Sequence, residues 1–327
     1  MRLGIDFGTT RTIVAHPDRG NFPVVHFENT TGDMVDHVPS VAAVVDGRLV
    51  HGFDAVRAAG TGAPLLRSFK RVLAGPAVTA ATPVKLPSAT AGPVSVGIGD
   101  LLTGFLGSLR RTLAESSTIA GELPDGPISC VIGVPANATG AQRLITLDSF
   151  HAAGFEVIGI LNEPSAAGLE FSHRQQRTLN SRRTKVVVYD LGGGTFDASL
   201  VNVDGTSHDV EASTGINHLG GDDFDEVLAR LATDRAGVDL SSAESAGLHE
   251  DARIAKEQLS PQSRRISLDV AGRPTTVTVD DFYVAALPLV TRSIEAMAPL
   301  VASLDGAGLA ESEIAGLHLV GGASSLP

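Results

Sequence analysis

Two segments of the chain follow one plan, and this repeat constrains the fold more than any other feature. DFGTTRTIVA begins at Asp6, and DLGGGTFDAS begins at Asp190, 184 residues later. In each, an apolar strand ends on the aspartate, a turn rich in glycine and threonine follows, and the chain returns as a second strand. A repeat at this separation indicates two related lobes, not a solenoid of short units. Two such lobes would present two similar turns to a shared cleft.

The rest of the chain alternates strand-like apolar runs with helical patterns, which is typical of layered α/β proteins. The elements that we expect are strands at 3–5, 12–15 and 129–136, a β segment at 38–47, and helices at 99–116 and 140–154. Residues 74–99 are rich in Pro, Ala, Thr and Gly, so we expect a loop there with one short strand. The basic segment 172–185 is interpreted as a solvated loop between the halves, the alternative being a contact with a phosphate or a partner.

Composition narrows the class of protein. The chain has 327 residues, enough for about two domains, and 43% are hydrophobic, which allows a large core. The net charge of −12 argues against nucleic acid or an acidic membrane as the main partner. A single cysteine, Cys130, excludes an intramolecular disulfide and fits a reducing compartment. No apolar run is long enough for a membrane helix and Asp6 interrupts any signal peptide, so we expect a cytoplasmic protein.

The glycine-rich turns match neither of the two common phosphate loops. No Gly-Lys pair occurs, which excludes the P-loop motif, and a G-x-G-x-x-G pattern counted from Gly192 ends on Asp197 with a strand following it. What remains is either a tight hairpin without function or a hairpin whose amides face an anion. A carboxylate beside a phosphate requires a cation between them, and Mg²⁺ prefers oxygen ligands and keeps several waters. We therefore expect Asp6 and Asp190 to hold Mg²⁺ through water.

Several motifs, taken in order, resemble the nucleotide-binding portion of a DnaK-type heat-shock chaperone, of the actin-like ATPase fold. GIDFGTT resembles its first phosphate motif, DLGGGTFD its second, and HLGGDDFD its glycine-acid turn. VPANATGAQR and LNEPSAAG resemble the segments that join the lobes, AKEQLS the purine-side helix, and LVGGASSLP the adenosine loop. The match covers almost the whole chain. Actin-like filament proteins and sugar kinases share the two hairpins, but NEPSAAG and GGDDFD favour the chaperone.

The resemblance implies an α/β, two-lobed actin-like ATPase (ribonuclease H-like) fold with nucleotide in the inter-lobe cleft. Lobe I would cover 1–172 and lobe II 173–327. Because the sequence ends at Pro327, within the adenosine loop, lobe II is expected to be truncated there and a peptide-binding domain to be absent. Pro135 and Arg143 match positions that couple the nucleotide state to the rest of such a chaperone.

The resemblance also implies the site residues. The expected nucleotide-binding residues are Gly8, Thr9, Thr10, Arg11, Gly192, Gly193, Gly194, Gly220, Gly221, Lys256, Ser260, Gly321, Gly322 and Ser324. For Gly220 and Gly221, the backbone amides are expected to touch phosphate. The expected catalytic residues are Lys70, Glu163, Asp190, Thr195 and Asp197.

Two of these assignments have simpler alternatives. Lys70, with Arg67 and Arg71 on the same helical face, could be part of a solvated basic stripe, and Glu163 could merely favour a helix start. The base side departs from the family pattern, since Arg253 stands where many members have a glutamate and Ser325 where an arginine commonly packs on adenine. Loss of an arginine–ring contact weakens binding roughly 2- to 30-fold. Base selectivity is therefore expected to be reduced, with ATP or ADP binding retained.

The function that follows is slow, Mg²⁺-dependent ATP hydrolysis coupled to lobe movement, with ATP/ADP and Mg²⁺ as cofactors. The expected protein is a monomer, and a nucleotide-exchange factor or a J-protein co-chaperone would be its partner. One alternative is a nucleotide-gated binding module with little turnover. The other is an actin-like filament former.

Overall fold

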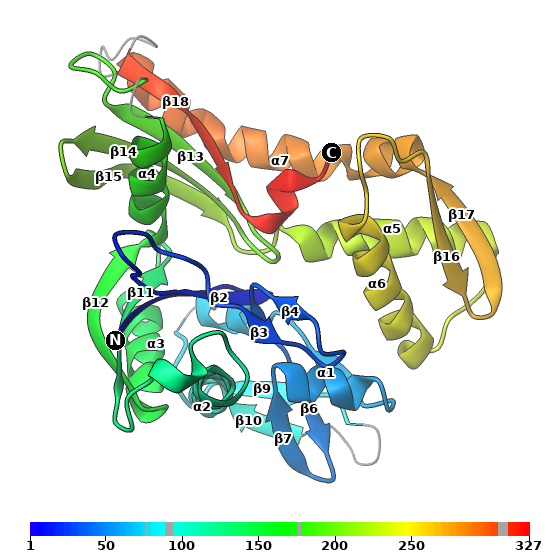
Figure 1. Ribbon diagram of the computed structural model, residues 1–327. Helices are drawn as coiled ribbons and strands as arrows, with labels where there is room; N and C mark the ends of the chain where they lie inside the picture. Colours follow the sequence, from blue (N-terminus) through cyan, green and yellow to red (C-terminus); the bar gives the residue numbers. More distant parts are fainter. Residues whose placement is uncertain (76, 89–93, 176–177, 307–312) are drawn as a thin grey trace. The chain divides into compact units, whose positions relative to one another are not determined.

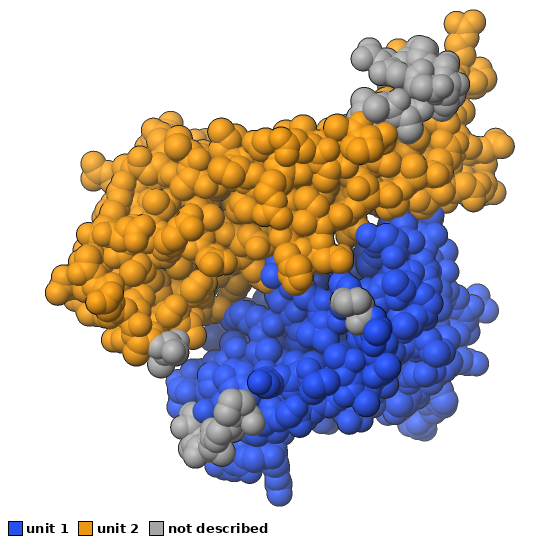
Figure 2. All heavy atoms as spheres, turned by 180° about the vertical axis from the view of Figure 1, so that it is seen from behind, with its two compact units in different colours: residues 1–166 blue, residues 167–327 orange. Residues whose placement is uncertain are grey.

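The computed structural model describes residues 1–75, 77–88, 94–175, 178–306 and 313–327. The chain divides into two compact units, residues 1–166 and 167–327 (Figure 2). The division falls within helix α4 (Glu163–Arg174), a few residues before the lobe boundary inferred from the sequence. Among the described residues, no helix combines the length and the apolar character needed to cross a membrane.

Unit 1 is built on a five-stranded mixed sheet with the order β12-β11-β1-β2-β5 (Figure 1). Its strands are β1 (Arg2–Phe7), β2 (Arg11–Ala15), β5 (Val38–Pro39), β11 (Ile128–Val134) and β12 (Phe155–Asn162). β1 runs antiparallel to β2 and parallel to β11, which runs parallel to β12. Helices α2 (Ile98–Glu115) and α3 (Gly140–Ala152) pack against each other, and α3 also packs on β12. The strands and helices expected from periodicity in this unit are confirmed.

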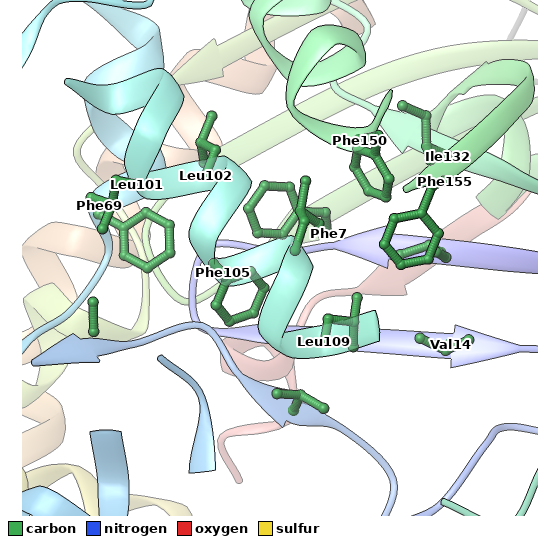
Figure 3. Packing of buried hydrophobic residues seen from close by; sticks show 14 of the residues in the cluster. Phe7, Val14, Phe69, Leu101, Leu102, Phe105, Leu109, Ile132, Phe150 and Phe155 are labelled. Atoms are coloured by element: carbon green, nitrogen blue, oxygen red, sulfur yellow. The ribbon is translucent and has the colours of Figure 1, made fainter. Parts of the chain in front are cut away.

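Aromatic rings hold the centre of unit 1 (Figure 3). The ring of Phe7, the last residue of β1, stacks on Phe105 of α2 with 5.4 Å between centroids and meets Phe150 of α3 at 6.2 Å. Phe150 in turn contacts Phe155 of β12 at 5.5 Å. All four side chains are buried, and each such burial contributes roughly 1.5–3 kcal/mol. The end of β1, from which the first glycine turn begins, is therefore anchored in the core.

The remainder of unit 1 consists of short strands and helices. These are β3 (Phe27–Glu28), β4 (Met34–Val35), β6 (Ala42–Val45), β7 (Arg48–His51), α1 (Phe53–Ala59), β8 (Leu65–Leu66), the 3₁₀ helices η1 (Phe69–Ala74) and η2 (Ala120–Glu122), β9 (Pro83–Leu86) and β10 (Val94–Gly97). The expectation of one short strand within 74–99 is wrong, because β9 and β10 form an antiparallel pair there. Val84 and Leu86 alternate with exposed residues in β9, a pattern that the surrounding prolines and alanines obscure in the sequence.

Unit 2 contains a four-stranded sheet with the order β15-β14-β13-β18. The elements of this unit are β13 (Lys185–Leu191), β14 (Phe196–Asp204), β15 (Ser207–Ile216), α5 (Gly221–Ala236), α6 (Ser242–Glu257), β16 (Arg265–Val270), β17 (Arg273–Thr278), α7 (Val279–Gly306), β18 (Ile314–Val320) and the 3₁₀ helix η4 (Gly322–Ser325). Phe196, Phe224 and Phe282 lie in its main hydrophobic core. β13 runs antiparallel to β14 and parallel to β18, as β1 does with β2 and β11. The repeat seen in the sequence is thus a repeat of strand topology.

Candidate functional site

The first glycine turn joins β1 to β2 through residues 8–10. A Cβ atom at Gly8 would lie 2.4 Å from the carbonyl oxygen of Arg11, so no other residue fits this backbone. Two carbonyl groups of the turn accept hydrogen bonds from Ser40: its Oγ donates to Gly8 O at 3.0 Å, and its amide donates to Thr10 O at 2.9 Å. Asp6 lies on the exposed side of β1, opposite the core. The turn is tightly specified. Desolvation raises the pKa of the Asp6 carboxyl beside it, although the nearby Lys70 acts to lower that pKa.

Lys70 belongs to η1, and its side chain contacts the last residue of β1, Phe7. Its Nζ donates to the carbonyl oxygen of Phe7, lies 5.0 Å from the centroid of the Phe7 ring, and is 3.9 Å from Glu163 Oε1. Only 13% of the Lys70 side chain is exposed, so the interpretation as a solvated basic stripe is wrong. Arg67 precedes η1 and does not share a helical face with Lys70. Burial of the stem directs the ammonium group to the carboxyl end of the sheet.

Glu163 begins α4 immediately after β12. A Cβ atom at Gly133 of β11 would lie 3.3 Å from Glu163 Cγ, so this glycine leaves room for the side chain. The parallel strands β1, β11 and β12 all end at the same edge of the sheet, where ligands of open α/β sheets usually bind. Unit 1 thereby brings together the first turn, Lys70 and Glu163.

Arg143 of α3 ties the segment after β11 to the end of β12. Its Nη2 donates to Pro135 O at 3.2 Å, to Ala136 O at 3.3 Å and to Asn162 Oδ1 at 2.9 Å. Asn162 is the residue before Glu163. Arg143, which the family resemblance matches to a coupling position, is therefore hydrogen-bonded to the residue that precedes the candidate catalytic Glu163.

The second glycine turn joins β13 to β14 in unit 2. The amide of Gly192 donates to Thr195 O at 3.0 Å, and Asp190 and Asp197 are paired across the two strands. A Cβ atom at Gly220 would lie 2.6 Å from the amide nitrogen of Gly194, so the start of α5 approaches this turn closely.

Hydrogen bonds hold the second turn against α5. The carbonyl groups of Gly192 and Gly193 accept from the amides of Gly221 at 2.9 Å and Asp222 at 2.8 Å. The amide of Gly220 donates to Asp223 Oδ2 at 2.8 Å. The expectation that the amides of Gly220 and Gly221 face phosphate is therefore wrong in this structure, because both are already donated. These glycines allow the close approach of α5 to the turn.

Lys256 also stabilises the start of α5. Its Nζ donates to Gly221 O at 2.8 Å and lies 2.6 Å from Asp225 Oδ1, and both side chains are more than nine-tenths buried. Desolvation raises the pKa of Asp225 from 3.8 to about 6, although the nearby Lys256 acts to lower it. The sequence did not indicate Asp225 as a partner, since acidic residues near a helix start are expected to be solvated and to interact with the helix dipole.

The base-side residues are arranged differently from the expectation. Ser260 lies beyond the end of α6 at Glu257, so it is not part of the expected helix, and its Oγ lies 3.2 Å from Ser263 Oγ. Arg253 forms ion pairs with Glu250 at 2.7 Å and Glu257 at 3.0 Å on its own helix.

Gly321 lies between β18 and η4 with φ 85°, and a Cβ atom there would lie 2.4 Å from Asp190 Oδ1. This glycine therefore packs against the carboxylate at the end of β13. Ser324 Oγ donates to Gly321 O at 2.7 Å, and the space around Gly322 is open. Unit 2 thus brings together the second turn, its two aspartates, the start of α5 and the loop after β18.

Within the described part of the chain, no group of three or more His, Cys, Asp or Glu residues could hold a metal ion. The single carboxylates near the ends of β1 and β13, Asp6 and Asp190, fit a hydrated Mg²⁺ better than a dehydrated one, since Mg²⁺ usually keeps several waters.

The sequence did not indicate Ser40 and Thr12, which are buried and hydrogen-bonded to each other at 3.0 Å. The sequence carries no periodic signal for a polar pair of this kind.

Comparison with known proteins places the chain in a family. A family model described as "Hsp70 protein" matches residues 111–327, well over half of the sequence. The chain belongs to the Hsp70 family. The chaperone protein DnaK of Mycoplasmopsis synoviae (strain 53) is 31% identical over 341 residues, which cover 99% of this chain and 52% of that protein. This Hsp70 chain therefore spans about half the length of the curated relative it matches. Hsp70 proteins have the actin-like ATPase fold, which confirms the fold class predicted from the sequence.

Proposed function

We propose that this Hsp70 chain binds ATP and ADP with Mg²⁺ and hydrolyses ATP slowly, as the nucleotide-binding portion of a DnaK-like chaperone. The observation that carries the proposal is the pair of glycine turns, one in each unit. In each, an aspartate is the second-last residue of the preceding strand, and carbonyl groups of the turn accept hydrogen bonds from another segment of the same unit. Membership of the family supports the same activity. We assign lobe I to about 1–172 and lobe II to about 173–327, with hydrolysis coupled to their movement.

In this proposal the turns bind the phosphates. Gly8, Thr9, Thr10 and Arg11 contribute donors from the first unit, and Gly192, Gly193, Gly194 and Thr195 contribute donors from the second. Many short donors fixed around one polyphosphate stabilise its charge without reorganisation. Asp6 and Asp190 would hold Mg²⁺ through water, and the bound ion would supply neutralisation of phosphate charge.

The catalytic role falls to Lys70 and to carboxylates near the ends of the strands. Lys70 Nζ is fixed by the Phe7 carbonyl and lies 3.9 Å from Glu163, so its charge is directed to one place without a large entropy cost. Glu163, Asp190 and Asp197 would accept hydrogen bonds from a water in line with the γ-phosphate, with Thr195 as a further polar group. The reaction then depends on positioning more than on covalent chemistry.

The base side is proposed to contribute less to affinity. The guanidinium group of Arg253 is paired with two glutamates of its own helix, and Ser325 Oγ donates to Gly322 O at 2.7 Å. Lys256 is likewise engaged by Asp225 and Gly221. We therefore expect the phosphates to dominate binding and GTP to be discriminated only weakly from ATP.

Calorimetric titration with ATP, ADP and GTP, with and without Mg²⁺, tests the binding proposal. Absence of ATP binding in the presence of Mg²⁺ would refute it. Single-turnover hydrolysis by Lys70→Ala then tests the catalytic assignment, and Lys85→Ala, in the exposed part of β9, is the matched control. Lys70→Ala is expected to bind ATP and lose turnover, while Lys85→Ala retains both. Unchanged hydrolysis in Lys70→Ala would refute the role of that lysine.

The partners and location remain part of the proposal. We propose a cytoplasmic monomer that responds to a nucleotide-exchange factor or a J-protein co-chaperone. Binding without turnover in the wild-type chain would support the alternative of a nucleotide-gated module. Sedimentation that depends on ATP and on protein concentration would support a filament former, which family membership does not favour.

A further inference from the structure

Ser40 forms three hydrogen bonds with the first glycine turn and the strand after it. Its Oγ donates to Gly8 O at 3.0 Å and lies 3.0 Å from Thr12 Oγ1, and its amide donates to Thr10 O at 2.9 Å. Since the Ser40 hydroxyl has one hydrogen and donates it to Gly8 O, Thr12 must be the donor in the pair of hydroxyls. Both side chains are fully buried. Ser40 follows β5, which pairs with β2, so the sheet fixes its place.

These bonds determine which way the turn presents its peptide groups. The carbonyl oxygens of Gly8 and Thr10 point to Ser40, inside the unit. Among the described residues, the backbone amides of Thr9 and Thr10 donate to no backbone carbonyl. A turn whose carbonyls are held on one side can offer its amides to an anion on the other, which is the geometry of a backbone anion site.

The carbonyl groups of the second turn are also held on one side, but by a different segment. There the carbonyls of Gly192 and Gly193 accept from the backbone amides at the start of α5. No helix begins against the first turn in this way within the described residues, and the amide and hydroxyl of Ser40 take the place of the helix amides. Two turns with similar sequences are thus held by unrelated segments in chemically equivalent ways.

We propose that Ser40, oriented by Thr12, is the positioning residue of the first phosphate turn. It does not touch the nucleotide; it holds the carbonyls of Gly8 and Thr10 inward so that the turn amides bind β- and γ-phosphate oxygens. The inference rests on the proposed function, because it requires that the turn bind phosphate.

The test compares Ser40→Ala with Ser149→Ala in the full chain. Ser149 is also a buried serine of unit 1, and its Oγ makes one long bond of 3.5 Å to Gly99 O, away from the turn. Affinities are measured calorimetrically for Mg²⁺-ATP and by ligand-detected NMR for adenosine, which lacks phosphates. Ser40→Ala is expected to bind ATP about 10-fold more weakly, equivalent to 1.4 kcal/mol, with unchanged adenosine affinity. Ser149→Ala is expected to change neither.

A second variant keeps the proposal testable if Ser40→Ala does not fold. Thr12→Val keeps the shape of the side chain and removes only the hydroxyl that orients Ser40. It is expected to lower the ratio of ATP to adenosine affinity about 3-fold. The double variant is expected to lose no more ATP affinity than Ser40→Ala alone, since both changes act through the same series of hydrogen bonds.

The outcomes separate the inference from the function on which it rests. A wild-type chain that binds no Mg²⁺-ATP refutes the proposed function. A wild-type chain that binds ATP, with Ser40→Ala or Thr12→Val weakening ATP and adenosine equally or neither, refutes the role of Ser40. Equal effects of Ser149→Ala and Ser40→Ala on ATP also refute it, because loss of any buried hydroxyl would then suffice.

Discussion

Replacing Lys256 by methionine removes one partner of a buried ion pair while keeping most of the side-chain volume. Lys256 Nζ lies 2.6 Å from Asp225 Oδ1 and donates to Gly221 O, and the two side chains are 9% and 8% exposed. The variant therefore leaves a buried carboxylate without its counter-charge and a helix start without one hydrogen bond. Breaking a buried pair in this way costs about 3–5 kcal/mol of unfolding free energy.

The pKa of Asp225 determines how this cost varies with pH. In the wild-type chain desolvation raises the pKa from 3.8 to about 6, which corresponds to about 3 kcal/mol of unfavourable ionisation even beside Lys256. The folded state binds the proton more tightly than the unfolded state, so the contribution of Asp225 to stability falls as pH rises from about 4 to about 6. Without Lys256 the folded pKa rises further. The variant then takes up a proton at a higher pH than the wild type, and the loss of stability shrinks as pH is lowered from 8 to 5.

Tyrosine fluorescence provides the assay. The chain has no tryptophan and two tyrosines, Tyr189 and Tyr283, which both belong to unit 2. Urea unfolding followed by their emission therefore reports the unit that contains the pair. We expect Lys256→Met to lose about 3–5 kcal/mol at pH 8 and distinctly less at pH 5.

Lys185→Met is the matched control for this prediction. Lys185 is also buried, at 9% side-chain exposure, and pairs with Glu211, but the Glu211 side chain is 36% exposed and can be rehydrated. The control should therefore lose less stability than Lys256→Met at pH 8. A loss in Lys256→Met that is the same at pH 5 and pH 8, or no larger than in the control, contradicts the reasoning about Asp225.

Two further predictions concern unit 1. Gly8→Ala should abolish detectable ATP binding in calorimetry, because its Cβ atom would lie 2.4 Å from Arg11 O. The control Gly107→Ala, in α2 with open space around it, should bind ATP normally and be stabilised by up to about 1 kcal/mol. Normal ATP binding by Gly8→Ala would show that the turn is not the site. Desolvation, with a smaller effect of the nearby Arg111, lowers the pKa of His51 from 6.5 to about 4. As pH falls, the unfolded chain therefore takes up a proton before the folded chain does, and the unfolding free energy of unit 1 should fall by about 2 kcal/mol between pH 7 and pH 5. His51→Leu should remove that part of the pH dependence in urea unfolding followed by circular dichroism, and an unchanged slope would mean that other groups cause it.

The sequence predicted much of the topology because hydrophobic periodicity is local. The hairpins at Asp6 and Asp190, the buried strand around Cys130 and the helix that ends near Gly154 can all be found from runs of a few residues. The hairpin of β9 and β10 was not found, since a four-residue alternation among prolines and alanines gives a weak signal. The family match rests on the same local motifs, and the comparison confirms it.

The candidate site was predictable only where chemistry depends on residue type alone. Glycines and strand-end aspartates in a fixed order indicate a phosphate turn. Whether an amide of such a turn is open or already donated depends on the neighbouring segment, and for Gly220 and Gly221 the expectation was wrong. The solvated interpretation of Lys70 was wrong for a related reason, because burial of its stem follows from packing against Phe7.

The sequence by itself determined the repeat of strand, aspartate, glycine turn and strand, because each copy is contiguous and its backbone needs are local. Only the tertiary structure decided what holds each turn: Ser40 for the first, and the start of α5, supported by Lys256 and Asp225, for the second. These partners lie about 30 or more residues from the groups they fix. Hydrogen bonds and ion pairs over such separations form when the chain is folded, and no sequence period encodes them.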